Sequence, residues 1–130
     1  MKSVKDKAES SAFKEQSDAL EIFNSAIDFL ASRSIPFSGE FFVPGTGVAI
    51  TYEHYLRYLF ALEWINPDSV VLDLGCGMGY GSALLSSKAK WVYSIDYNGE
   101  LIQLVRELKK NFSLINITPI EGKVEDLEEM

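Results

Sequence analysis

The segment VVLDLGCGMGYG (residues 70–81) decides the fold, because a glycine-rich loop follows directly on a short apolar run. A short apolar run bounded by glycine is typical of a parallel strand that is buried on both faces. The loop opens a helix expected around 80–88, and backbone N–H groups at such a helix start bind ligands at the carboxyl end of the strand. We therefore expect a ligand-binding turn at residues 75–79.

Two common glycine motifs do not fit this loop. A dinucleotide-binding G-x-G-x-x-G/A motif would need its last small residue at Tyr80 or at Ser82. A G-x-x-x-x-G-K-[ST] phosphate loop would need its second glycine at the same two positions. A nicotinamide-dependent enzyme is thereby disfavoured, and the pattern that remains is D-x-G-x-G-x-G, from Asp73 to Gly79.

This pattern resembles motif I of the class I S-adenosylmethionine-dependent methyltransferases. The resemblance implies a Rossmann-like α/β fold with S-adenosylmethionine as the cofactor. It also implies that the loop packs against the methionine part of the cofactor and that the acid helps to hold its amino group. These roles would fall on Asp73, Gly75, Gly77 and Gly79, and Cys76 lies within the same loop.

A second set of candidate residues follows the next two strands. Asp96 closes the predicted strand 91–95, at about the 20-residue spacing from Gly75 at which an acid meets ribose hydroxyls. Tyr97 offers an aromatic face to adenine. The resemblance implies a ribose-binding role for Asp96 and adenine-side roles for Tyr97 and Val124. Lys123 stands where the family commonly has an acid.

Structural alternatives stay open for several of these residues. Asp96 could instead cap the helix predicted over 99–110, although Asn98 could do so equally well. Cys76 is interpreted as a small filler rather than a nucleophile, since no base stands beside it. His54, the single histidine, could act as a base or simply pack. The residues of the second helix that could line the cofactor entrance or belong to the core are Tyr52, Tyr55, Arg57 and Tyr58.

The rest of the chain is predicted from periodicity. An apolar stripe indicates a first helix that ends near 32–34, before Pro36; its members are Phe13, Leu20, Phe23, Ile27 and Leu30. An irregular loop follows, and then a second helix capped by Thr51 with Tyr55, Leu59 and Leu62 facing inward. Leu56 and Phe60 are further candidates for the inward face of this helix. We expect residues 1–65 to form a helical cover and 66–130 to form the first half of a Rossmann-like domain, with a third strand near 116–120. Residues 38–62 are also similar to the entrance segment of bacterial methyltransferases found with sugar and cell-surface biosynthesis.

The composition of the chain limits the classes of partner that we expect it to bind. The 130 residues contain 12 Lys and Arg against 19 Asp and Glu, a net charge of −7, which argues against a nucleic-acid partner. A single cysteine excludes a disulfide framework, and we expect no metal. No signal peptide and no run of about 20 apolar residues is evident, so we expect no membrane partner and a cytoplasmic setting.

The sequence therefore predicts an S-adenosylmethionine-dependent methyltransferase acting on a small-molecule or sugar-like acceptor. The alternative is a non-catalytic module, derived from a methyltransferase, that binds the cofactor or another protein. No residue clearly positions an acceptor, and only the first three strands of the resembled sheet are present. We therefore expect a truncated domain that either self-associates, through an exposed sheet edge or by swapping, or is marginally stable.

Overall fold

Three parallel strands form the centre of the protein. The computed structural model describes residues 4–33 and 48–129. The strands lie side by side in chain order: β1 (Val70–Leu74), β2 (Trp91–Asp96) and β3 (Ile117–Glu121). Leu74 pairs with Ile95, and Asp96 pairs with Glu121, so the carboxyl ends of the three strands meet at one edge. The predicted Rossmann-like parallel sheet is confirmed.

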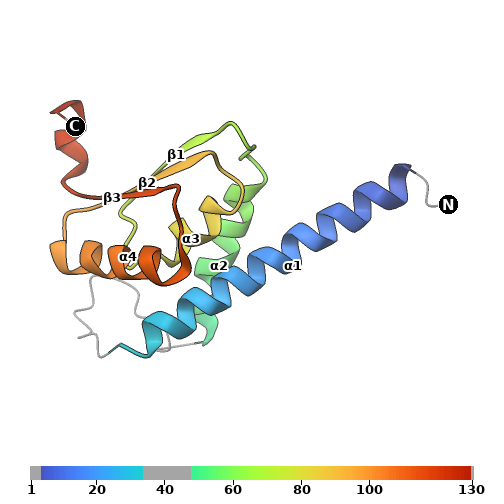
Figure 1. The fold of residues 1–130 in the computed structure, drawn as a ribbon, viewed down its shortest axis with the longest axis horizontal. Coiled ribbons are helices and arrows are strands. Elements are labelled where there is room, and N and C mark those ends of the chain that lie inside the picture. Colours follow the sequence, from blue (N-terminus) through green and yellow to red (C-terminus); the bar gives the residue numbers. More distant parts are fainter. Residues whose placement is uncertain (1–3, 34–47, 130) are drawn as a thin grey trace.

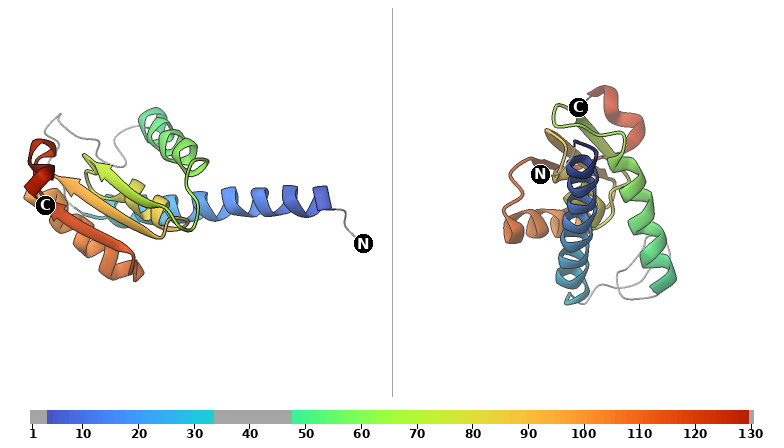
Figure 2. Two further views of the ribbon diagram at one scale, coloured as in Figure 1. Left: turned by 90° about the horizontal axis from the view of Figure 1, so that it is seen from above. Right: turned by 90° about the vertical axis from the view of Figure 1, so that its right-hand side faces the viewer.

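The α-helices lie on one side of this sheet (Figures 1 and 2). Helix α3 (Tyr80–Ser86) connects β1 to β2, and α4 (Gly99–Phe112) connects β2 to β3. A 3₁₀ helix, η1 (Val124–Glu129), follows β3. None of the helices in residues 4–33 and 48–129 combines the length and the apolar character that a membrane span requires.

Helix α1 (Val4–Ala31) packs under the domain with its second half, while its first half extends away from it (Figure 1). The stripe predicted for this helix is partly wrong. Phe23 and Leu30 are buried, but Leu20 is 44% exposed. The small side chains of Ala19 and Ala26 occupy the buried face instead, because they permit close packing of the helices. The side chain of Phe13 lies outside the described residues.

Helix α2 (Val48–Leu62) begins before the predicted cap. Thr51 therefore lies within the first turns of the helix and does not cap it. Tyr55 and Leu62 are buried as expected, and Leu59 is partly buried. The inward placement of Leu56 and Phe60 is wrong, because they are 41% and 62% exposed on the side of the helix that faces away from the core. The loop predicted between the two helices falls mainly on residues 34–47, which are outside the described part of the chain.

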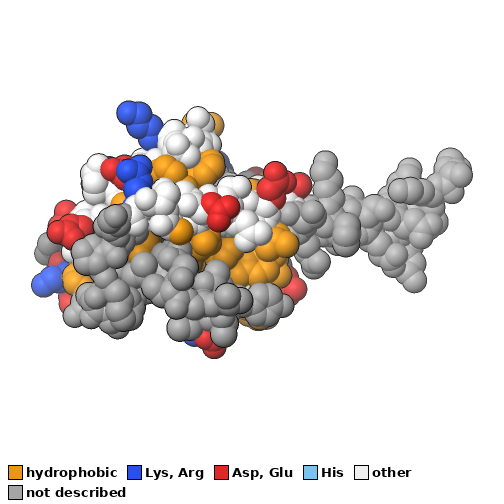
Figure 3. Space-filling view, turned by 90° about the horizontal axis from the view of Figure 1, so that it is seen from below, with side chains coloured by type: hydrophobic (Ala, Val, Ile, Leu, Met, Phe, Trp, Pro, Cys, Tyr) orange, Lys and Arg blue, Asp and Glu red, His pale blue; other side chains and the backbone are white. Residues whose placement is uncertain are grey.

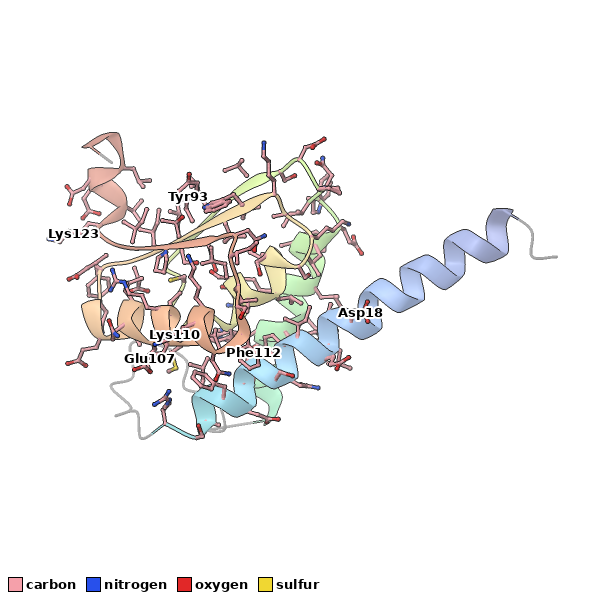
Figure 4. The ribbon with its side chains drawn as sticks, in the orientation of Figure 1. Asp18, Tyr93, Glu107, Lys110, Phe112 and Lys123 are labelled. Carbon is pink, nitrogen blue, oxygen red and sulfur yellow. The ribbon has the colours of Figure 1, made fainter. Side chains whose placement is uncertain are left out.

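Strand β1 is buried on one face only, which corrects the expectation that both faces are covered. Val70, Leu72 and Leu74 are 60%, 54% and 44% exposed. Their side chains alternate with those of Val71 and Asp73, which face the helices. The described helices cover a single face of the sheet, so every second residue of this apolar run is left outside. On the same outer face, Tyr93 of β2 projects away from the helices (Figure 4).

Helices α1 and α4 are also in contact. The rings of Phe29 and Phe112 lie 5.8 Å apart in an edge-to-face arrangement. Arg33 forms a salt bridge with Glu107 at 3.4 Å. This packing fixes α4, whose other end begins at the carboxyl edge of the sheet.

Candidate functional site

The glycine loop leaves β1 in a backbone conformation that favours glycine. Gly75, Gly77 and Gly79 have φ angles of +71°, +59° and +92°. At Gly79 an added Cβ would also lie 3.0 Å from a methyl group of Val105, so both the backbone and the packing against α4 require glycine. The backbone N–H of Gly75 donates to the carbonyl oxygen of Ile95 at 2.8 Å, which ties the loop to the end of β2.

Asp96 connects this loop to the start of α4. Asp96 is the last residue of β2 and is 8% exposed. Its Oδ2 accepts a hydrogen bond from the N–H of Gly77 at 3.0 Å, and its Oδ1 accepts one from the N–H of Asn98 at 2.9 Å. The N-cap of α4 is Asn98, whose side chain accepts from Glu100 and Leu101. The helix therefore does not need Asp96 as its cap.

A hollow of about 230 Å³ opens beside Asp96. Its lining comes from the loop after β1, the end of β2 and the segment after β3, namely Gly75, Ile95, Asp96, Tyr97, Gly122, Lys123, Val124 and Glu125. Four of the predicted site residues are thus brought together, because the carboxyl ends of parallel strands share an edge. Tyr97 and Val124 are 62% and 53% exposed, so each presents an accessible apolar surface.

The sequence interpretation missed part of this lining. Ile95, Gly122 and Glu125 were not among the predicted site residues. Their position in the sequence could have identified them. Ile95 lies at the end of the second strand, and Gly122 and Glu125 follow the third strand at the same edge of the sheet. Lys123, the departure from the resembled pattern, lies in this lining next to η1 (Figure 4).

Asp73 lies in a different environment from Asp96. Its side chain points into the helix layer and is 8% exposed. The Ser82 hydroxyl donates to Asp73 Oδ2 at 2.6 Å, and the Tyr58 hydroxyl donates to Oδ1 at 3.3 Å. Burial raises the pKa of the Asp73 carboxyl; the two hydrogen bonds oppose the rise, and the charge of Asp96 adds to it. Asp73 is thus close to the glycine loop but not in the lining of the hollow.

Two other candidate groups, His54 and Cys76, lie outside the lining of the hollow. His54 Nδ1 lies 2.7 Å from the Tyr80 hydroxyl. Burial lowers the pKa of His54, as does the charge of Arg57, while Glu53 raises it, so the imidazole is neutral at neutral pH. Burial, followed by Asp73 and Asp96, raises the pKa of the Cys76 thiol, which keeps it protonated and a poor nucleophile.

No group of three or more His, Cys, Asp or Glu residues in the described part of the chain is placed to hold a metal ion. The site therefore offers hydrogen-bond acceptors, a glycine-lined backbone and two apolar surfaces. Such a set can bind and orient a ligand that has hydroxyl groups and a flat ring. The side chain of Tyr52, a further candidate, lies outside the described residues.

Several known proteins that are similar to this chain are described as methyltransferases. A probable cobalt-precorrin-6B C(15)-methyltransferase (decarboxylating) of Methanocaldococcus jannaschii is 33% identical over 68% of this chain and 48% of that protein. The chain thus spans about half the length of that relative. A Streptococcus mutans protein described as a methyltransferase and solved with S-adenosylhomocysteine (SAH) has a TM-score of 0.54 at 23% identity. That comparison covers 57% of this chain and 42% of the other, and it supports the fold.

The exclusion of a nucleic-acid partner is wrong. A tRNA m1G37 methyltransferase of M. jannaschii matches with a TM-score of 0.54 and 25% identity, over 66% of this chain and 25% of that chain. Net charge averages over the whole chain and hides local cations: basic side chains lie beside acidic ones on the helix side (Figure 3). Arg106, Lys109 and Lys110, for example, line one hollow together near the end of α4. The acidic balance of this chain therefore does not exclude nucleic acid.

The α/β part of the chain carries the family match. A family model described as a methyltransferase domain matches residues 65–130, half of the chain. The match includes the glycine loop, Asp96 and all the residues that line the hollow beside it. On this evidence the chain belongs to the methyltransferase domain family.

Proposed function

We propose that the protein is an S-adenosylmethionine-dependent methyltransferase and that the hollow at the carboxyl edge of the sheet binds the nucleoside part of the donor. The observation that carries the proposal is the joint lining of this hollow by Gly75, Asp96, Tyr97 and Val124. A volume of about 230 Å³ is below the roughly 300–1,000 Å³ of pockets that enclose a whole drug-sized ligand. The hollow therefore suits one part of the donor.

Asp96 is suited to the ribose. Each of its carboxylate oxygens accepts one backbone N–H, and a carboxylate oxygen has a further lone pair for a ligand hydroxyl. Because both backbone donors come from the loop and the start of α4, the carboxylate is held in one orientation before the ligand arrives. Tyr97 and Val124 would then pack against the adenine.

The methionine part of the donor would lie along the glycine loop. A Cβ added at Gly75 or Gly77 would meet no atom within 4 Å, so space next to the loop is open to a ligand. Gly79 and Cys76 would support the loop from behind, since both are buried. Asp73 would contribute its negative charge to the binding of the donor's ammonium group.

Methyl transfer from a sulfonium is an in-line displacement, in which the protein mainly orients the donor and the acceptor. In this proposal, residues 66–130 hold the donor and residues 1–65 cover it. We propose a small molecule as the acceptor, on the strength of the precorrin methyltransferase that is 33% identical to this chain. A radiolabelled-methyl assay of the full-length protein with small-molecule extracts and with total RNA tests this; transfer to RNA alone would overturn the acceptor class.

Donor binding is tested by calorimetric titration of the protein with SAH. We expect saturable binding that Asp96→Ala abolishes. Asp68→Ala is the matched control, since Asp68 is an exposed acid in the turn before β1, at the opposite end of that strand. No heat with SAH would overturn the proposal. Saturable NADH binding that depends on Asp96 would favour a nicotinamide enzyme instead.

A further inference from the structure

One side chain of α2 reaches the strand that leads into the glycine loop. The ring of Tyr58 lies against Gly81, where an added Cβ would be 1.9 Å from the ring carbon Cζ. Its hydroxyl lies 3.3 Å and 3.5 Å from the two carboxylate oxygens of Asp73. Gly81 thus leaves the space through which α2 contacts Asp73 directly.

Asp73 is held by hydroxyl groups. Besides Tyr58, it accepts a 2.6 Å hydrogen bond from Ser82, and the Ser94 hydroxyl donates to Ser82 Oγ at 2.6 Å. Ser82 and Ser94 are fully buried. Two hydroxyls, from α2 and α3, therefore hold the carboxylate directly, and the hydroxyl of Ser94 in β2 holds Ser82. Since each buried hydroxyl has its own fixed partner, the orientation of Asp73 is determined before any ligand binds.

The groups that face Asp73 do not neutralise it. Those that interact with it electrostatically among the described residues are Tyr58 from α2, Tyr80 from α3, Cys76 from the loop and Asp96 from β2. All of these are neutral or negative at neutral pH. A buried carboxylate without a cation is costly, and a cationic ligand at the loop would supply the missing charge.

We infer that Tyr58 is a positioning residue of the donor site, which orients Asp73 and favours its ionised form so that its charge acts on the donor's ammonium group. The inference rests on the proposed donor binding and deepens it. It gives α2 a role in donor affinity beyond covering the domain. The electrostatics of Asp73 agree with this role. Burial raises the pKa of the Asp73 carboxyl, and the hydrogen bond from Tyr58 lowers that pKa and so favours the ionised form.

The test is the pH dependence of SAH binding, measured by calorimetry on the full-length protein. SAH carries the ammonium group, and the affinity of the wild type should fall on the acid side as Asp73 takes up a proton. Tyr58→Phe keeps the ring against Gly81 and removes only the hydroxyl. We expect the fall in SAH affinity at acid pH to begin at a higher pH in this variant. Within the pH range of the fall, its affinity should be about three- to tenfold below that of wild type. The high-pH plateau should change by less than about twofold.

Controls separate positioning from packing. Tyr93→Phe removes the same hydroxyl from the outer face of the sheet, away from the helices, and should keep the wild-type profile (Figure 4). Ser82→Ala should shift the fall in the same direction as Tyr58→Phe. In a protein that already carries Asp73→Asn, Tyr58→Phe should cause no shift. Thermal melts of each variant confirm folding.

Two outcomes would overturn the inference while leaving the proposed function intact. In one, wild type binds SAH, and Tyr58→Phe lowers the affinity at high pH without moving the acid-side fall. Such a result would mean that Tyr58 acts only through packing. In the other, Tyr58→Phe still moves the acid-side fall in a protein that already carries Asp73→Asn, so that the shift does not act through Asp73. A wild type that does not bind SAH at any pH overturns both the proposed function and this inference.

Discussion

The carboxyl ends of β1 and β2 each carry an aspartate, and the two differ in what holds them. Asp73 and Asp96 are equally buried, at 8% exposure. Asp96 accepts its hydrogen bonds from the backbone of the glycine loop and of the α4 start, and it lines the hollow. Asp73 accepts from the side chains of Ser82 and Tyr58, inside the helix layer.

This difference shows that equal burial does not imply an equal role. A carboxylate held by backbone N–H groups is fixed by the fold itself, and its remaining lone pairs can face a ligand. A carboxylate held by hydroxyls depends on two other side chains, each of which a single substitution removes. We therefore expect Asp96 to carry direct donor contacts and Asp73 to act through charge.

The largest expected effect is on donor affinity at pH 8, where the two acids are compared by the same substitution. Asp96→Asn should weaken SAH binding about 100-fold, because charge-assisted hydrogen bonds to ligand hydroxyls are each worth about 1.5–3 kcal/mol. Asp73→Asn should cost about tenfold or less, since only a charge near the ammonium is lost. Calorimetric titration measures both. Equal losses would remove the distinction between the two strand ends.

The next largest effect is expected on stability, at the glycine loop that follows β1 and is hydrogen-bonded to the end of β2. Gly79→Ala places a side chain at a φ of +92° and 3.0 Å from Val105. Left-handed strain and overpacking together should lower the free energy of unfolding by about 2 kcal/mol. Urea unfolding measures this, with Gly122→Ala as a control glycine outside the loop and without a positive φ. A loss below about 0.5 kcal/mol in Gly79→Ala would show that the loop adapts freely.

Much of this comparison could be predicted from the sequence. Periodicity and glycine placement identify the three strands and the two crossover helices. The common edge of parallel strands then brings Gly75, Asp96, Tyr97 and Val124 together. These features depend on local pattern and on a general rule of sheet topology, which a single sequence carries.

The rest depends on contacts between elements that are distant in sequence. The exposed face of β1 could not be predicted, because an apolar run does not reveal how many of its faces are covered. The use of Ala19 rather than Leu20 on the buried side of α1 depends on how closely the helices approach. The partners of Asp73 come from α2 and α3, and no spacing rule connects Tyr58 to it.

Asn98 allows the cap of α4 to be tested separately from Asp96, the acid at the end of β2 that we propose binds the donor. Its side chain accepts from Glu100 and Leu101, so Asn98→Ala should lower the free energy of unfolding by about 1 kcal/mol. SAH affinity should change by less than about threefold, because the backbone N–H that holds Asp96 is retained. Denaturant unfolding and calorimetry check the two parts. A loss of affinity as large as that of Asp96→Asn would show that the cap and the acid act as one unit.

The smallest effect is the pH dependence of stability at the end of β1. Burial raises the pKa of Asp73 in the folded protein above its ordinary value of 3.8. The folded state therefore binds more protons than the unfolded state between these two values, and stability from this group grows as the pH falls through that window. The free energy of unfolding of wild type, relative to Asp73→Asn, should rise as the pH falls from 8 toward 3.8, in urea unfolding without ligand. A difference that falls instead would mean that a cation of the protein already neutralises Asp73, and the reason for expecting a cationic ligand at this strand end would be lost.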